Sequence, residues 1–97
     1  MYQQGDVLIK RVDKIQGKKT ESNILADGEM TGHAHRVTSG NTCMYRDGND
    51  LYLDVLSDIA TITHEEHNPC TVERGIYKIE IVQEYDHFLE EARNVQD

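Results

Sequence analysis

Apolar and polar residues alternate along several short stretches of this chain, which is typical of strands that bury one face. The alternation is clearest in 75–85, where Tyr77, Ile79 and Ile81 fall on one side of a strand. It recurs in 5–12, where Val7 and Ile9 fall on one side and Leu8 and Val12 on the other. Because side chains point to opposite faces at successive positions, both stretches are predicted to form strands.

Five further strands are predicted between turn signals. They cover 24–26, 30–38 with an interruption at Gly32, 42–46, 50–56 and 59–64. The clearest hairpin joins 42–46 to 50–56 through Asp47-Gly48-Asn49, because Asp-Gly tolerates the positive φ of a tight connection. A turn is predicted over 65–69, and the lysine-rich segment 13–21 is predicted to be a mobile loop.

Near the end of the chain the apolar residues no longer alternate but follow the spacing of a helix. Asp86 offers an N-cap, and the apolar residues that follow at helical spacing are Phe88, Leu89, Ala92 and Val95. We therefore predict one mainly β domain over 1–97: a small antiparallel β-barrel or sandwich of six to seven short strands, with a short C-terminal helix or tail over 85–97.

Composition narrows the class of protein. The 97 residues carry a net charge of −8, which argues against a nucleic-acid binder that neutralises phosphates. No apolar run reaches the roughly 18–20 residues that span a bilayer, and the first residues lack the pattern of a signal peptide, so we expect a cytoplasmic protein. Two cysteines, Cys43 and Cys70, make a disulfide framework improbable.

The charge is unevenly distributed. Residues 10–19 hold five basic side chains against one acid, whereas 80–97 hold six acids against Arg93. These two stretches are complementary, and the predicted helix has an apolar stripe that suits a subunit boundary. We expect a homo-oligomer, with a dimer favoured because two-fold closure is the commonest. A simply solvated charged surface is the alternative.

Chemistry concentrates in two histidine pairs. His33 and His35 lie two apart in a predicted strand, so they share a face with Cβ atoms about 6–7 Å apart. Two imidazoles placed in this way can converge on one ion at about 2.0–2.1 Å from each nitrogen. Two surface or hydrogen-bonded histidines are the alternative for this pair.

His64 and His67 form the second pair, at the change from strand to turn. They are three apart, which does not fit the helical zinc-protease pattern of histidines four apart. Glu65 and Glu66 between them are candidate catalytic residues: either could serve as a ligand, an orienting group or a general base. Cys70 is a possible extra ligand, or a small buried side chain.

The set His33, His35, His64 and His67 therefore predicts one divalent-metal site, with zinc placed first and iron, manganese or nickel as alternatives. Four protein ligands would make the metal structural, and three plus water would leave a position for hydrolytic or oxidative chemistry. Metal-free histidine chemistry and purely structural histidines are the alternatives. Arg36 would suit a small anionic ligand. The rival function is a non-enzymatic oligomeric module.

Three blocks of this sequence resemble a family of small bacterial and phage proteins. They are 28–36 (GEMTGHAHR), 63–67 (THEEH), and Gly75-Ile76-Tyr77 with Gln83-Glu84-Tyr85. The resemblance spans Gly5 to Tyr85 and implies a shared site around the two histidine blocks, without naming its chemistry.

Two partial likenesses concern the fold. The spacing of Gly28, His33 and His35 is similar to a shortened first cupin motif, one residue short and without the glutamate that follows it. The stretch 5–12, the lysine-rich loop and Ile24-Leu25 are similar to the start of bacterial co-chaperonins. Both likenesses imply a β-barrel, and neither carries an activity to this chain.

Overall fold

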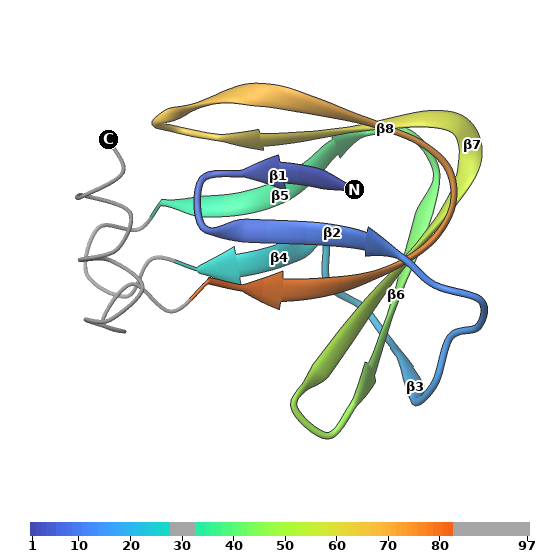
Figure 1. Ribbon diagram of the computed structural model, residues 1–97. Helices are drawn as coiled ribbons and strands as arrows, with labels where there is room; N and C mark the ends of the chain where they lie inside the picture. Colours follow the sequence, from blue (N-terminus) through green and yellow to red (C-terminus); the bar gives the residue numbers. More distant parts are fainter. Residues whose placement is uncertain (28–32, 83–97) are drawn as a thin grey trace.

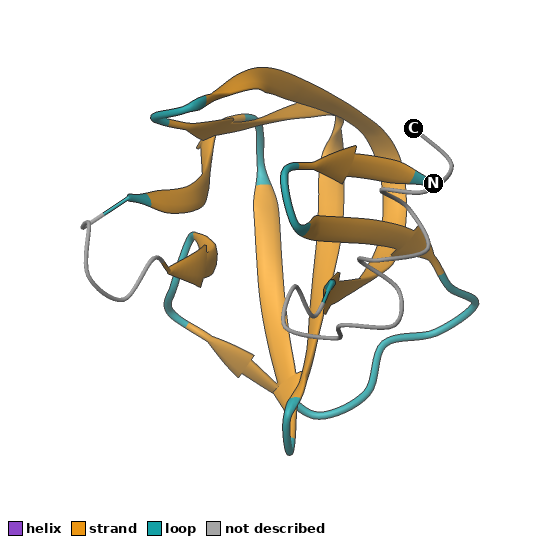
Figure 2. Ribbon diagram, turned by 60° about the vertical axis from the view of Figure 1, so that its left-hand side comes forward, coloured by secondary structure: helices purple, strands orange, loops and turns teal. Residues whose placement is uncertain are grey.

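The computed structural model describes residues 1–27 and 33–82. All the regular structure in these residues is β, and no helix occurs among them (Figure 2). The strands are β1 (Tyr2–Gln4), β2 (Val7–Arg11), β3 (Lys18–Thr20), β4 (Ile24–Asp27), β5 (Ala34–Ser39), β6 (Thr42–Asp47), β7 (Asp50–His64) and β8 (His67–Ile81). The prediction of a mainly β chain is confirmed.

The eight strands form one sheet in which every pair is antiparallel. The order along the main path is β1-β2-β8-β7-β5-β4, and β6 pairs with both β7 and β3. This sheet curls into a half-barrel (Figure 1). The sandwich alternative is wrong, because one curled sheet encloses the core where two packed sheets would be needed.

The long hairpin of β7 and β8 produces the curl. Each strand has 15 residues, and their register shifts between Val55 and Ile59, where β7 carries extra residues opposite β8. A bulge bends a strand and increases its twist. Gly75, with a φ of 151°, lies at this bend opposite Val55. Figure 1 shows both strands turning together there. β7 can therefore pair with β6 along its first half and with β5 near its end.

The core lies inside the curl and is built from alternating positions of these strands. Its fully buried large side chains are Val7, Ile9, Met44, Leu53, Val55, Ile62, Val72 and Tyr77. The prediction that Val7 shares a strand face with Ile9, and Tyr77 with Ile79, is confirmed, and all four side chains are buried. Ile81, the last residue of β8, is 42% exposed. The alternation thus ends where the sheet opens, and this open end borders the histidines.

Several local predictions need correction. Strands are more numerous than expected, and two are long, because the predicted strand 50–56 continues unbroken into 59–64. The segment 13–21 contains β3, which pairs with β6. The predicted turn 65–69 is only two residues long, and Pro69 lies in β8, which pairs with β7 through this stretch. A proline lacks an N–H and is accepted where that side of a strand needs no donor.

Other predictions fall outside the described residues. The C-terminal helix at 85–97 and the start of the predicted strand 30–38 belong to them. The acidic stretch 80–97, which is expected to contact a second subunit, also lies outside the described residues except for 80–82. The dimer therefore stays a prediction. In the described residues no helix has the length and apolar character required to cross a membrane.

Candidate metal centre

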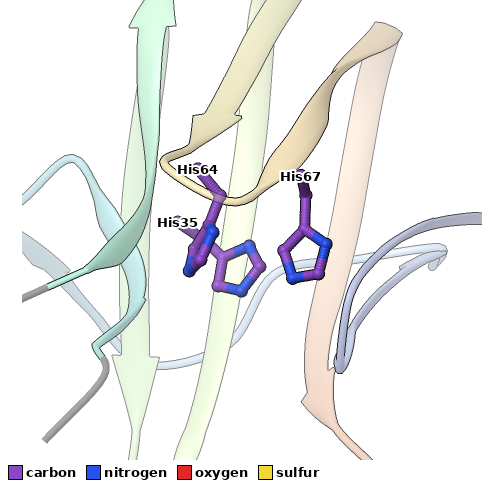
Figure 3. Close-up of side chains that lie close together, drawn as sticks. All are labelled: His35, His64 and His67. Carbon is purple, nitrogen blue, oxygen red and sulfur yellow. The ribbon is translucent and has the colours of Figure 1, made fainter. Parts of the chain in front are cut away.

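The two histidine pairs, distant in sequence, lie side by side in the fold. β5 carries His35 and begins directly after His33, while β7 ends at His64 and β8 begins at His67. β5 pairs with β7 at Arg36 and Thr63, which brings the pairs together. Figure 3 shows the rings of His35, His64 and His67 gathered beneath the β7–β8 turn.

Ring positions define how close the four imidazoles are. The His64 ring centroid is 4.3 Å from that of His35, 4.7 Å from that of His67 and 5.7 Å from that of His33. Two groups have ligand atoms that all lie within 4.8 Å of one another: His35, His64 and His67, and His33, His64 and Glu65. Nitrogens around a tetrahedral ion lie roughly 3.4 Å apart, so small side-chain rotations would complete either group.

A buried glutamine fixes the proton position on His35. Gln4 is 3% exposed, and its Nε2 donates to the carbonyl oxygens of Ile62 at 2.8 Å and Asn68 at 2.9 Å. Both amide hydrogens are therefore used, and Oε1 must accept from His35 Nδ1 at 2.8 Å. His35 consequently carries its proton on Nδ1, which leaves the lone pair on Nε2.

That lone pair faces an acid. His35 Nε2 lies 3.4 Å from Asp6 Oδ1, and His35 is 4% exposed. Burial, and next the neighbouring His64, lower the pKa of His35, while Asp6 opposes them. The lowered pKa keeps the ring neutral near pH 7, so two electron-rich atoms face each other. A cation between them would relieve this repulsion.

Side chains hold the turn that carries His64 and His67. The backbone N–H of Glu66 donates to His64 Nδ1 at 3.0 Å, and the backbone N–H of Ala34 donates to Glu65 Oε1 at 3.0 Å. This second bond lowers the pKa of Glu65 and ties the turn to β5. In this arrangement the lone pair of neutral His64 is on Nδ1. An ion bound there replaces the Glu66 bond, and an ion bound at Nε2 requires the proton to move to Nδ1.

His33 and His67 stand at the two sides of the cluster. His33 Nδ1 lies 3.5 Å from Glu66 Oε2. His67 packs closely against Gly5 in the β1–β2 turn, so a Cβ added at Gly5 would collide with the His67 ring. The β1–β2 and β7–β8 turns therefore meet at the histidines, and a cavity of about 550 Å³ opens beside them.

The structure separates the other sequence candidates from the site. Cys70 pairs with Ile62 and packs against the core, where burial raises the pKa of its thiol, so it supplies no ligand atom to either group. Arg36 does not line the cavity. Sequence reasoning missed Gln4 and Asp6, which flank the Gly5 turn. Nothing in their local pattern distinguishes them from an ordinary polar turn.

Comparison with known families places most of this chain in one group. Residues 3–82 match a family described as a domain of unknown function (DUF8820). The chain belongs to this family. The match to DUF8820 includes both histidine pairs and both turns that meet at them, and it agrees with the predicted resemblance to a family of uncharacterised small proteins. Searches of curated proteins and of solved structures find no match, so neither the cupin nor the co-chaperonin likeness gains support.

Proposed function

We propose that this DUF8820 protein binds one divalent metal ion through His35, His64 and His67. The observation that carries the proposal is the Gln4 network, which leaves the lone pair of His35 on Nε2, facing Asp6, in a ring whose centroid lies 4.3 Å from that of His64 and 5.8 Å from that of His67. Histidines that bind metals characteristically donate their other ring N–H to a fixed acceptor. Gln4 supplies such an acceptor, and its own orientation is fixed by two backbone carbonyls.

The competing group of His33, His64 and Glu65 is the less suitable one. Glu65 already accepts the Ala34 N–H, whereas the Nε2 atom of His35 is left open by the bond from Nδ1 to the buried Gln4. Since both groups use His64, one ion in the first group excludes a second ion that needs the same nitrogen. We therefore assign His33 to a place beside the ion, where it contacts Glu66.

Three imidazoles leave a coordination position for Asp6, water or a substrate. A bound zinc ion would supply Lewis acidity and a more acidic water, which suits a hydrolase. Two histidines with the Asp6 carboxylate would instead suit iron and an oxygenase. Glu66 lines the cavity and is the candidate base, whereas Glu65 is held by the Ala34 N–H and positions the turn.

Metal titration of tag-free protein tests the proposal. After treatment with a chelator, the protein is titrated with Zn²⁺, Fe²⁺, Mn²⁺ and Ni²⁺, and bound metal per chain is measured. We expect one ion per chain for at least one metal. Failure of all four to bind at this stoichiometry would remove the proposed function.

Nitrogen NMR of the imidazole rings gives an independent readout, because it distinguishes protonated from unprotonated ring nitrogens. We expect His35 to carry its proton on Nδ1 both before and after Zn²⁺ is added. The His64 signals should change in either case, because an ion at Nδ1 replaces the Glu66 N–H there and an ion at Nε2 moves the proton to Nδ1. A His35 ring protonated on Nε2 in the neutral free protein would contradict the assignment of this atom as a ligand.

A further inference from the structure

The cavity beside the histidines has two chemically different ends joined by an apolar wall. At one end lie the histidines with Asp6 and Glu66, and at the other lie Arg46 and Asn49. The wall between them consists of Leu25, Ala26, Leu51, Ile79 and Ile81. A volume of about 550 Å³ falls within the roughly 300–1,000 Å³ typical of small-molecule sites.

Strand register places these two ends on different strands of the sheet. Asp6 precedes Val7, which pairs with Ile81 of β8. Two residues earlier in β8, Ile79 pairs with Leu51 of β7, and Leu51 pairs with Arg46 of β6. Arg46 thus lies two strands beyond Ile79, which is roughly 10 Å across the sheet. A ligand that touches both ends must be an elongated small molecule.

Charge decides which kind of molecule fits. Arg46 is the one cationic side chain among the described residues that line the cavity. It is exposed and forms no ion pair with the described residues. Counted as formal charges, the two carboxylates of Asp6 and Glu66 and the guanidinium of Arg46 give the lining a net charge of −1. A divalent ion at the histidines changes this to +1, so the loaded cavity attracts an anion and the metal-free cavity repels it.

From these observations we infer that the cavity binds a small organic acid with two oxygen-rich ends. One end supplies an oxygen ligand to the ion, the aliphatic or aromatic middle lies on the apolar wall, and the other end is a carboxylate bound by Arg46. A guanidinium binds a carboxylate through two parallel hydrogen bonds, which gives direction as well as affinity. This inference rests on the proposed function, because the ion supplies both the first contact and the change of charge. It also assigns to Arg46 the anion-binding role that was predicted for Arg36.

Three linear acids of similar length test this inference by calorimetry with the Zn²⁺-loaded full chain. Adipate has a carboxylate at each end, hexanoate has one, and 6-aminohexanoate places an ammonium where the second carboxylate would be. We expect adipate to bind about threefold more tightly than hexanoate, since an ion pair at an exposed guanidinium contributes a modest amount to affinity. We expect 6-aminohexanoate to bind most weakly, and adipate not to bind to metal-free protein.

The variant Arg46→Met should remove the preference for adipate while Zn²⁺ affinity stays unchanged. Lys18→Met is the matched control, because Lys18 of β3 pairs with Arg46 of β6 but does not line the cavity. This variant should retain the preference for adipate. Equal binding of adipate and hexanoate, a preference that survives Arg46→Met, or equal adipate binding without metal would overturn the inference. If Zn²⁺ binds but adipate does not, only this inference fails; if Zn²⁺ does not bind, the proposed function fails with it.

Discussion

The two turns at the ends of β7 differ in what holds them. The β6–β7 turn consists of Gly48 and Asn49, and Gly48 has a φ of 63°. The β7–β8 turn consists of Glu65 and Glu66, and no non-glycine residue among those described has a positive φ. The first turn has the backbone that two-residue hairpins favour, with glycine at its first central position. The second lacks it and depends on side chains.

Those side chains come from distant parts of the sequence. Glu65 accepts the N–H of Ala34 in β5, and His64 accepts the N–H of Glu66 within the turn. The β1–β2 turn packs against His67 from the other side. A turn that backbone preference does not dictate is thus held in place by the residues of the site. The first turn is therefore determined by its backbone, whereas the second is determined by its side chains.

The largest expected difference between the two turns is in Zn²⁺ affinity when a residue at each is replaced. We expect His35→Ala and His64→Ala each to weaken Zn²⁺ binding by about a hundredfold or more, since loss of supporting partners alone costs about 10–100-fold. The double variant should lose less than the sum of the two free energies, because either change already breaks the site. Asn49→Ala in the other turn is the control and should leave Zn²⁺ affinity unchanged. Full additivity, measured by competition with a chromophoric chelator, would mean two separate sites.

Two glycine variants, one in the β1–β2 turn and one in the β6–β7 turn, should have a smaller effect on Zn²⁺ affinity than the loss of a ligand. Gly5 and Gly48 have φ values of 61° and 63°, so alanine should cost each turn roughly 1–2 kcal/mol of folding stability. A Cβ at position 48 meets nothing within 4 Å, whereas one at position 5 meets the His67 ring. That ring can rotate away, so Gly5→Ala should lower Zn²⁺ affinity about tenfold or more, and Gly48→Ala should not. Equal Zn²⁺ affinities in two variants of similar stability in urea would show that His67 is not a ligand.

The smallest expected effect is on pH dependence. The pKa of His35 is lowered in the folded protein from its ordinary value of 6.5, mainly by burial. As the pH falls through 6.5, the unfolded chain therefore takes up this proton before the folded chain does, and the free energy of unfolding of the metal-free protein should decrease. Urea unfolding at pH 7.5 and 5.5 measures the change. His35→Ala should reduce it; an undiminished change would assign the proton uptake to another group.

The sequence predicted the parts of this molecule that local rules determine. Alternation located β2 and the inward face of β8, and Asp-Gly located the first turn. The two histidine pairs were predicted to share a site, and the structure places them together because β5 pairs with β7. This much followed from residue type and spacing.

The rest depends on register between distant segments, which no local pattern reveals. Gln4 acquires its role only when β1 lies beside the ends of β7 and β8, where the carbonyls of Ile62 and Asn68 are 58 and 64 residues away. Arg46 reaches the cavity through its pairing with Leu51. The lysine-rich composition of 13–21 likewise concealed β3, since Lys18 and Lys19 gain strand structure only by pairing with β6.

The most direct test of the central claim is anomalous diffraction at the zinc absorption edge from crystals of the Zn²⁺-loaded, tag-free protein. We expect one strong peak per chain, within about 2.0–2.1 Å of His35 Nε2 and of one nitrogen each of His64 and His67. The second His35 nitrogen should keep its hydrogen bond to Gln4. A peak between His33, His64 and Glu65, or no peak at the β7–β8 turn, would contradict the account.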